Sequence, residues 1–502
     1  MATTKFRPAL SEDLPVTGQR LVTALTMGRI WGETSLQVYF GNDETIGLND
    51  RFGQFYHSIY QGPADESFNT TFRALAARSF SQVEAVTGLA FTEVASTRGA
   101  DLLFVSASNN RLDEMDTEGA FLFPGLVKTG TGGSDSWSLG LFSSANAALT
   151  SSAERGGGTY GGWTMIHEIG HGLGLKHTHN EDTGLPLAVT GALDNEKYSV
   201  MSYNGASEGV RYGHAVTPMA LDIALLQALY GKTEQAAGRS TYTLMDGARA
   251  VLDLTEGDVS IGRAYYSIWD SGGRDRIDYS GKGSSVLINL NAATLDTARV
   301  SADLMQIFKA IKLTEFYTFL SRELRLEIFD KGQHAGGFFS RVLDVSTGEF
   351  QGVDGGFSIA NGVVIEEAVG GKNADMLIGN AGANWLWGNA GDDTLIGGGG
   401  NDVLRGGAGD DVLNGGSGDD LLIGGPGDDV FVFAKGNQRD TIRDFRDGDV
   451  VALTGFSSIQ SFDDLIDRAR DVAGDVVITL GKDVLVLENR TIASLHGDDF
   501  FI

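Results

Sequence analysis

Residues 167–180 read HEIGHGLGLKHTHN and hold four of the eight histidines in the chain. His167 and His171 are four residues apart, so a helix would place both imidazoles on one face, one turn apart. Gly174 lets the chain turn sharply, so that His177 can return to the same point. Three neutral imidazoles with an open fourth position are typical of a catalytic zinc site, because structural zinc sites are closed by four protein ligands. The spacing therefore predicts a catalytic zinc centre.

Three further residues complete the predicted centre. Glu168 would not be a ligand; it would take a proton from the zinc-bound water and pass it to the leaving amine. Met201 lies in the stretch YSVMSYN, where a methionine turn would form a buried apolar floor beneath the zinc. Tyr203 would be a further zinc ligand that swings away to hydrogen-bond the oxyanion. We expect His179 to lie at the rim and not to bind the metal.

Composition limits the function classes. With 502 residues and 42% hydrophobic residues, the chain is expected to form two or more domains with ordinary cores. Its net charge of −28 opposes nucleic-acid binding and suits either calcium binding or salty surroundings. The chain has no cysteine, so a zinc site must use histidine, carboxylate or tyrosine. We find no transmembrane run and no cleaved N-terminal signal pattern.

Glycine accounts for 70 residues, and its excess is localised in a segment that begins at Gly370. From Gly370 to Val432 the sequence forms seven nine-residue units, each with a glycine-rich turn, an acidic or amide residue at position six and an apolar residue at position eight. The unit matches the calcium-binding repeat of RTX proteins. The aspartates would stack along a coil that is unstable without cation, with calcium held between successive turns by carboxylate and carbonyl oxygens. A flexible linker would not keep this register. The predicted ligands at position six are Asp375, Asp393, Asp402, Asp411, Asp420 and Asp429.

Hydrophobic periodicity predicts a mixed N-terminal part and an all-β C-terminal part. Strands are expected at 35–41 and 100–107, and helices at 67–88, 164–177 and 217–231, the second stopping near Gly174. Beyond the repeats we expect capping strands, a short helix within 461–474, and strands at 475–480 and 483–489.

Together these motifs resemble the serralysin family of secreted metalloendopeptidases. The resemblance rests on HEIGHGLGLKH, SVMSY, DIALLQALYG, YYSIWDSGGRDRIDYSG, the nonapeptides and DDVFVF. It implies an α+β metzincin catalytic domain at 1–235, followed by an all-β parallel β-roll with an antiparallel C-terminal cap at 236–502. The nonapeptides would span 370–432, and the cap with the secretion signal 433–502.

The same resemblance implies zinc and several calcium ions as cofactors, and protein or peptide substrates. It also implies type I secretion through an ABC transporter that reads an uncleaved C-terminal signal; Asp499-Phe500-Phe501-Ile502 fits that signal. A proteinaceous inhibitor is a further suggested partner, and the oligomeric state is left open. By analogy a further calcium site would use Arg239, Thr243, Asp270, Gly272 and Asp275.

Several positions depart from the family pattern. Thr178 follows the third histidine where the family usually has proline, and Thr241 replaces a usual glycine near Arg239. The second repeat carries Asn384 with Trp385 and Trp387, which predicts weaker calcium binding there.

An insertion at about 302–350 is also foreign to the family. Its apolar residues have helical spacing, which predicts one long or two shorter helices. Packing against the β-roll is the favoured role; a dimer interface, a lid over the substrate cleft and a membrane-surface contact are the alternatives.

The first interpretation is a secreted, calcium-stabilised zinc endopeptidase. The alternative from another class is a secreted calcium-binding adhesin or matrix protein with an inactive peptidase domain. The complete set of site residues weighs against that alternative. A cytoplasmic metal-storage role fits poorly, because weak calcium sites would stay empty there.

Overall fold

The computed structural model divides the chain into two compact units. The first comprises Met1–Gln235, Arg263–Ser271 and Thr294–Thr297, and the second Ala236–Gly262, Gly272–Ala293 and Ala298–Ile502. The residues that the structure describes are 6–8, 29–42, 70–96, 99–107, 119–128, 134–143, 160–178, 194–196, 198–204, 214–234, 237–244, 254–255, 258–261, 264–281, 285–293, 341–344, 349–351 and 355–502.

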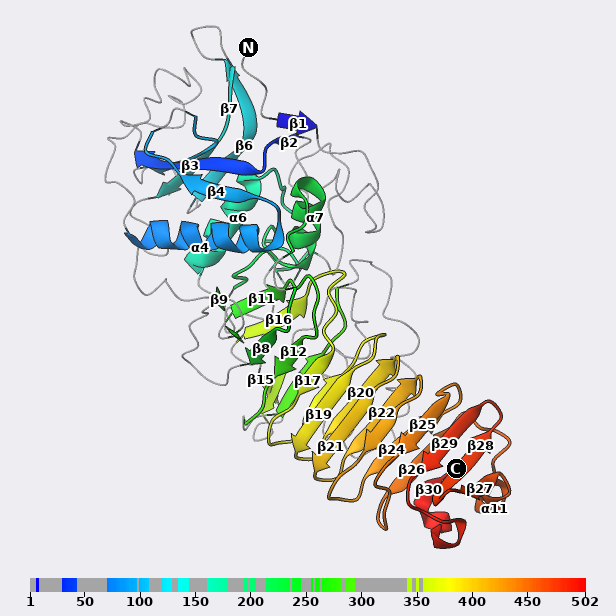
Figure 1. The fold of residues 1–502 in the computed structure, drawn as a ribbon. Coiled ribbons are helices and arrows are strands. Elements are labelled where there is room, and N and C mark those ends of the chain that lie inside the picture. The colour runs from blue at the N-terminus through cyan, green and yellow to red at the C-terminus, as the bar shows by residue number, and fades with distance from the viewer. Residues whose placement is uncertain are drawn as a thin grey trace. The chain divides into compact units, whose positions relative to one another are not determined.

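The first unit combines helices with a five-stranded sheet (Figure 1). Its helices are α4 (Thr70–Val86), α6 (Tyr160–Gly172) and α7 (Ala220–Tyr230). Its strands are β1 (Phe6–Pro8), β2 (Arg29–Trp31), β3 (Ser35–Asn42), β4 (Ala90–Glu93), β5 (Leu102–Ala107), β6 (Gly119–Lys128), β7 (Ser134–Ser143) and β11 (Ala264–Ile268).

The sheet of the first unit has the strand order β4-β3-β5-β7-β6. Four of its strands are parallel, and the edge strand β6 runs antiparallel to β7. Helix α4 packs on this sheet through Phe72, whose ring lies 5.0 Å from that of Phe142 and 6.5 Å from that of Phe104. All three rings are buried, so an aromatic core fixes the helix against the sheet.

Helix α6 ends where the sequence predicts. Gly174 has a φ of 96°, a left-handed conformation that glycine adopts readily. The free carbonyl groups at this end find partners from distant segments: the Trp31 indole donates to Gly172 at 3.1 Å, and the Tyr230 hydroxyl donates to Leu173 at 2.6 Å. The end of the helix is therefore held by strand β2 and helix α7.

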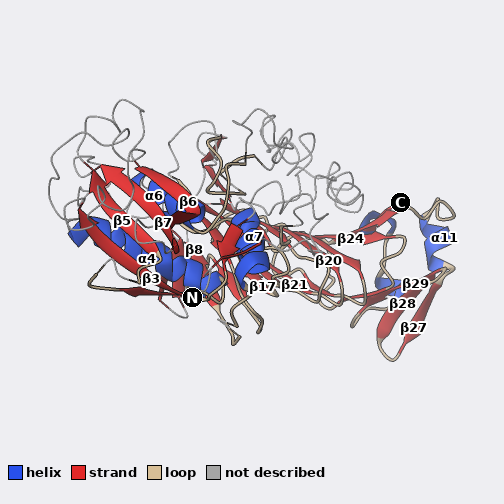
Figure 2. Ribbon diagram, turned by 90° about the horizontal axis from the view of Figure 1, so that it is seen from above, coloured by secondary structure: helices blue, strands red, loops and turns tan. Residues whose placement is uncertain are grey.

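The regular secondary structure of the second unit's described residues consists mainly of strands (Figure 2). It contains β8 (Thr241–Leu244), β9 (Leu254–Thr255), β10 (Asp258–Ile261), β12 (Arg276–Asp278), β13 (Ser285–Asn289), β14 (Arg341–Asp344), β15 (Glu349–Gln351), β16 (Gly355–Ile359), β17 (Glu367–Val369), β18 (Met376–Ile378), β19 (Trp385–Ala390), β20 (Thr394–Gly399), β21 (Val403–Ala408), β22 (Val412–Ser417), β23 (Leu421–Ile423), β24 (Val430–Ala434), β25 (Arg439–Ile442), β26 (Val450–Thr454), β27 (Ala469–Val472), β28 (Asp475–Leu480), β29 (Asp483–Leu487) and β30 (Phe500–Phe501). Its described part also contains helix α11 (Phe462–Ile466) and the 3₁₀ helices η5 (Ile492–Ser494) and η6 (Gly497–Asp499).

Successive repeat strands alternate between two parallel sheets, which confirms the predicted β-roll. Strands β18, β20, β22 and β24 are neighbours in one sheet, and β19, β21, β23 and β25 in the other. The apolar position-eight residues align across strands: Leu377 pairs with Leu395, and Leu386 with Leu404. These side chains are fully buried, because alternate residues of each strand point into the coil.

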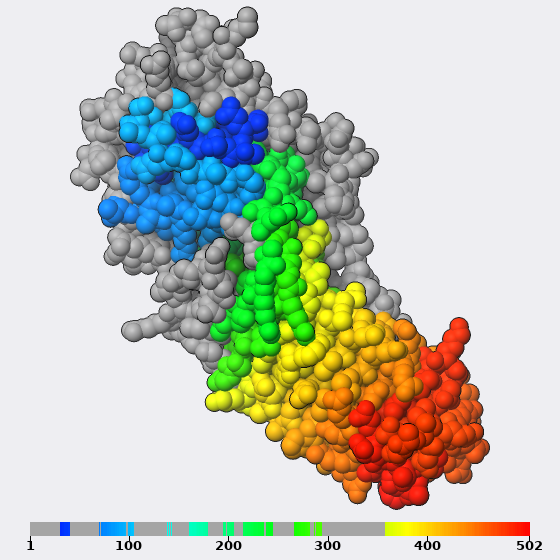
Figure 3. Space-filling view, in the orientation of Figure 1, coloured from blue at the N-terminus to red at the C-terminus, as the bar shows by residue number. Residues whose placement is uncertain are grey.

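The outer faces of these two sheets differ. In β18, β20 and β22 both faces are buried where the strands begin, whereas β19 and β21 expose alternate residues. In Figure 3 the repeats and the cap of the second unit run from yellow to red.

Two secondary-structure predictions need correction. The helix expected within 461–474 ends at Ile466, and β27 follows as an antiparallel partner of β28. The segment that joins β27 to β28 has positive φ angles at Ala473 and Gly474, which favour a tight turn and not a continued helix. The insertion at 302–350 was predicted to be helical, but its last part forms the strands β14 and β15. These two strands pair with each other, and β14 pairs with β13, all antiparallel. Residues 302–340 of the insertion lie outside the described part. Among the described helices, none is long and apolar enough to cross a membrane.

Candidate metal centres

The three predicted zinc ligands converge on one point. The Nε2 atom of His177 lies 3.2 Å from that of His167 and 2.9 Å from that of His171. Helix α6 supplies His167 and His171, and the turn at Gly174 brings His177 back to them. All three ligand atoms lie within 4.8 Å of one another, so the geometry fits one metal ion held by three imidazoles.

Backbone carbonyl groups fix the orientation of two of these rings. Nδ1 of His167 lies 2.7 Å from the Val200 carbonyl oxygen, and Nδ1 of His171 lies 2.8 Å from that of Leu175. If each Nδ1 carries the proton, each Nε2 presents its lone pair to the metal. Burial, together with the neighbouring His177, lowers the pKa of His171 to about 3, which keeps its imidazole neutral.

Met201, the predicted floor residue of the site, packs against helix α6. It is buried, and a Cβ atom added to Gly170 would lie 2.6 Å from its sulfur. Because Gly170 has no side chain, the Met201 thioether can pack directly against the helix backbone. Tyr203 completes the cluster, since its hydroxyl oxygen lies 2.9 Å from Nε2 of His177 and its ring stacks on that of His167.

The predicted general base lies beside these ligands. Glu168 follows His167 on helix α6 and is buried. Trp163, one turn earlier, packs its ring 5.0 Å from that of His167. His179 lies outside the described residues.

Thr178 joins the third histidine to the methionine turn. Its hydroxyl donates to Asp194 Oδ1 at 2.6 Å, and its backbone N–H donates to the Met201 carbonyl at 3.2 Å. The Ser202 hydroxyl donates to the same Asp194 oxygen at 2.8 Å. Hydrogen bonds thus restrain the residue after His177, where the family pattern has the fixed φ of proline. Sequence reasoning did not identify Asp194.

Asp222 of helix α7 holds the methionine turn through hydrogen bonds. The sequence analysis did not identify this residue either. Its carboxylate accepts hydrogen bonds from the Ser199 hydroxyl at 2.6 Å, from the Val200 N–H at 2.7 Å and from the Met219 N–H at 2.9 Å. Burial raises its pKa to about 6, although these three donors oppose the shift. Because Val200 in turn orients His167, Asp222 is a positioning residue for the metal centre.

We expect Asp222→Ala to destabilise the first unit by about 3 kcal/mol, because it leaves three buried donors without their acceptor. Thermal unfolding of the zinc-loaded chain would measure the loss, and metal analysis after dialysis should show poorer zinc retention. Ser199→Ala removes one of the three bonds and should have a smaller effect, while the exposed Glu234→Ala should have none. A variant as stable as wild type would show that the carboxylate does not hold the turn.

The aspartates of the repeats form two rows, one for each sheet. The backbone N–H of Asp375 donates to Asp393 Oδ1 at 2.7 Å, and that of Asp393 donates to Asp411 at 2.8 Å. The second row joins Asp402 to Asp420 in the same way at 2.8 Å. The sequence suggests one stacked row, but residues nine apart start strands of opposite sheets. The rows continue past the repeats into the cap, where Asp449 accepts from Asp429 at 3.0 Å.

The second carboxylate oxygen of these residues marks a cation site. Oδ2 of Asp393, Asp402, Asp411, Asp420 and Asp429 is buried without a hydrogen-bond partner. In each case the oxygen lies in the space that a side chain on a nearby glycine would fill. At Gly388, for example, an added Cβ would collide with Asp393 Oδ2 and lie 2.6 Å from the Gly406 carbonyl oxygen. Carboxylate and carbonyl oxygens that gather around one small space fit calcium.

These carboxyl groups titrate abnormally in the metal-free roll. Burial raises the pKa of Asp393 to about 10, with the charge of Asp375 adding to the shift. Burial likewise raises the pKa values of Asp402 and Asp411 to about 8. Without a cation, these side chains therefore favour the neutral acid.

In the second repeat, where Asn384 replaces the aspartate, side-chain and backbone amide groups form hydrogen bonds at the position that a cation would occupy. Its Oδ1 accepts from the Asn380 N–H at 2.7 Å, and its Nδ2 donates to the Ile365 and Glu366 carbonyls at 3.3 Å each. The Asn380 amide also donates to Ile365, at 2.8 Å. Side-chain N–H groups thus donate to backbone carbonyl oxygens at this repeat. In the other repeats, carbonyl oxygens would bind calcium.

We expect Asn384→Asp to add one calcium ion per chain, because it restores the carboxylate at this repeat. Calorimetric titration with calcium would give the stoichiometry. Asn401→Asp adds the same charge at an exposed neighbouring position and should leave the count unchanged. If the count is the same in both variants and wild type, the repeat does not bind calcium even with a carboxylate.

The residues of the further predicted calcium site fall in both units. Asp270 belongs to the first unit, and Arg239, Thr243, Gly272 and Asp275 to the second. Within the second unit, Asp275 Oδ1 accepts from the Ser240 N–H at 2.7 Å, next to Arg239. Thr243 lies on β8, where it pairs with Asp278. This site stays a prediction.

The fold and these two kinds of site define a metallopeptidase-type domain joined to a calcium-type β-roll. Residues 56–201 match the Matrixin family, and residues 369–404 and 396–431 match the RTX calcium-binding nonapeptide repeat. The chain thus carries a matrixin domain followed by RTX repeats, which implies zinc at the three histidines and calcium in the roll.

Its similar curated proteins include several serralysins. It is 34% identical to Metallopeptidase AprA of Pseudomonas marginalis over 44% of this chain and 46% of that protein. It is 32% identical to Metalloprotease AprA of Pseudomonas entomophila over 61% of this chain and 51% of that protein, and 32% identical to Serralysin of Proteus mirabilis over 45% and 47%. The chain spans about half the length of these relatives.

Proposed function

We propose that the chain is a secreted zinc endopeptidase that hydrolyses proteins, with Glu168 as general base and calcium stabilising the β-roll. The convergence of the His167, His171 and His177 Nε2 atoms, with Tyr203 in contact, carries the proposal. The matrixin match and the metalloprotease relatives support the same reaction class.

Zinc bound at the three histidines would act as a Lewis acid toward the scissile carbonyl and a water molecule. The chain supplies the proton transfers. Glu168 takes a proton from the attacking water and delivers it to the amide nitrogen as the peptide bond breaks. Glu168 is buried on helix α6, directly after the ligand His167 in the sequence.

Tyr203 stabilises the charge that develops on the substrate. Its hydroxyl is at the cluster and its side chain is 53% exposed, so it can move between His177 and a bound peptide. Donation to the carbonyl oxygen as that oxygen becomes negative lowers the barrier.

Casein digestion by the zinc- and calcium-loaded full chain tests the proposal. We expect cleavage that a zinc chelator abolishes and added zinc restores. A chain that binds one zinc ion and calcium but cleaves neither casein nor gelatin would favour the adhesin or matrix-protein alternative.

The secretion route is part of the proposal. Type I export would read the C-terminal residues, of which Phe500 is buried and Phe501 and Ile502 are exposed. Co-expression with a type I transporter should place the full-length chain in the medium, and removal of residues 499–502 should retain it in the cell. Export of both forms alike would contradict this assignment.

A further inference from the structure

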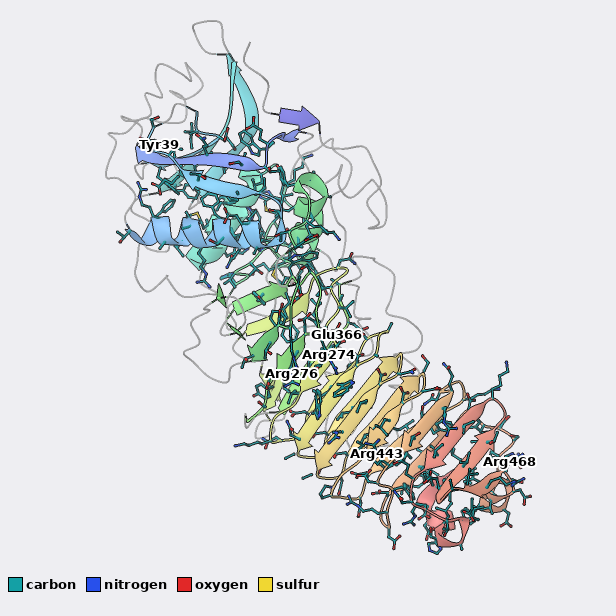
Figure 4. The ribbon with its side chains drawn as sticks, viewed as in Figure 1. Tyr39, Arg274, Arg276, Glu366, Arg443 and Arg468 are labelled. Atoms are coloured by element: carbon teal, nitrogen blue, oxygen red, sulfur yellow. The ribbon has the colours of Figure 1, made fainter. Side chains whose placement is uncertain are left out.

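An arginine–tryptophan face lies on the outer surface of the roll, and one of its residues, Arg239, is also among those of the further predicted calcium site. We define it by six residues of the second unit: Arg239, Arg274, Arg276, Trp385, Trp387 and Arg405. The inward neighbours Ile277, Leu386 and Leu404 are fully buried. Because side chains alternate along a strand, Arg276, Trp385, Trp387 and Arg405 point outward. Figure 4 labels Arg274 and Arg276 beside strand β12.

Three arginines of this face share one buried carboxylate. Glu367 is 2% exposed and lies 3.1 Å from Arg239, 2.7 Å from Arg274 and 2.5 Å from Arg276. One carboxylate neutralises one guanidinium, so positive charge remains. The side chains of Arg239 and Arg274 are 59% and 45% exposed, which leaves donor groups open to solvent.

The tryptophans are held in place by the same arginines. The Arg274 guanidinium lies 4.1 Å from the ring centroid of Trp385, and that of Arg276 lies 5.1 Å from that of Trp387. The two rings are 5.7 Å apart. Trp385 is nevertheless 40% exposed. A large aromatic ring that stays partly exposed while an arginine packs against it is typical of a binding surface.

The carboxylates near this face are less exposed than Arg239, Arg274 and Arg405. Arg405 is exposed and pairs in register with Trp387 on the adjacent strand. Three other carboxylates nearby accept hydrogen bonds from backbone groups. Glu366 accepts from the Asp275 N–H, Asp278 from the Ser280 N–H, and the buried Asp275 from the Ser240 N–H, each at 2.7 Å. Four arginines and four carboxylates lie in this described region, but Glu367 and Asp275 are buried. Arg239, Arg274 and Arg405 are exposed, so arginines predominate on the outer surface, although acidic residues outnumber basic ones 66 to 38 in the whole chain.

We propose that the arginine–tryptophan face binds an acidic polysaccharide. Guanidinium groups match carboxylates in a two-point fashion, and an exposed indole offers a flat apolar surface to a sugar ring. Strands β17, β19 and β21 are paired on both sides, so they offer a peptide no free edge to extend. The net charge of −28 repels the dense charge of a nucleic acid, whereas a uronate polymer carries one charge only on its acidic sugars.

The test uses the calcium-loaded full chain and a hyaluronan octasaccharide, in which uronate and neutral sugars alternate. Calorimetry should show saturable binding that weakens with salt, and no binding of maltooctaose, the neutral comparison. Trp385→Ala and Arg405→Ala should each weaken the affinity at least tenfold. Lys482→Ala removes one exposed charge in the cap, between β28 and β29, and should change the affinity less than twofold.

Three results would overturn the proposal: no binding of the octasaccharide, equal binding by wild type and both face variants, or equal binding of maltooctaose. Tighter binding of polyglutamate or oligothymidylate, lost in Trp385→Ala, would reassign the face to another partner and overturn it too. Unchanged calcium stoichiometry in each variant verifies that the roll is folded. Because peptidase activity enters none of these measurements, the outcome is independent of the proposed function.

Discussion

Replacing Glu168 by alanine should abolish casein cleavage while leaving zinc in place. The three imidazoles bind the metal without this carboxylate, since their Nε2 atoms meet at one point. Loss of a general base costs about a thousandfold in rate. Metal analysis and casein digestion, on the same preparation, measure the two halves of this expectation.

Two further variants make the result specific. Glu168→Gln keeps the size of the buried side chain but not its basicity, so it should be as inactive as alanine. Glu234→Ala removes an exposed carboxylate of the first unit and should be fully active. If Glu168→Gln retains activity, the proton passes through another group. If Glu168→Ala loses zinc, the carboxylate helps to hold the metal, which contradicts the expectation.

Removing calcium should unfold the repeats at pH 8 but leave helix α6 folded. Hydrogen exchange on metal-free protein, prepared by chelation and gel filtration, should show lost protection at 393–432 and retained protection at 160–172. The reason is the two rows of buried carboxylates, whose Oδ2 atoms have no hydrogen-bond partner in the roll. Once ionised, they repel one another and are poorly solvated.

The pH dependence of the metal-free roll follows from the same groups. In the folded roll, the pKa values of Asp402 and Asp411 are raised to about 8, whereas in the unfolded chain they are about 4. The folded state therefore holds protons that the unfolded state releases, and stability falls as pH rises from about 4 to about 8.

Protection at 393–432 without calcium should consequently be greater at pH 5 than at pH 8, after correction for the intrinsic exchange rates. With calcium bound, protection should instead be greater at pH 8 than at pH 5, because protons compete with the cation for the carboxylates. Asp411→Asn should reduce both effects, while Asp498→Asn, an exposed position, should change neither. Equal protection with and without calcium at pH 8 would contradict calcium stabilisation of the roll.

The sequence by itself determined the parts whose chemistry is local. Histidines four apart on one helix, a glycine that ends it, and a nine-residue period each act over a few residues. Short-range geometry therefore sufficed to predict that the three histidines meet, where helix α6 ends, and the β-roll. The helix expected after Ile466 was wrong, because Arg470 and its neighbours pair with β28 instead; strand pairing overrode helical spacing.

Only the tertiary structure decided how distant residues meet. Asp194 and Asp222 are ordinary acidic residues in the sequence, and their hydrogen bonds to Thr178 and to the methionine turn depend on folding. The division of the repeat aspartates into two rows depends on strand alternation between sheets. The arginine–tryptophan face likewise arises because parallel pairing places β12, β17 and β19 side by side. These contacts are set by register between strands far apart in the chain, which no local pattern encodes.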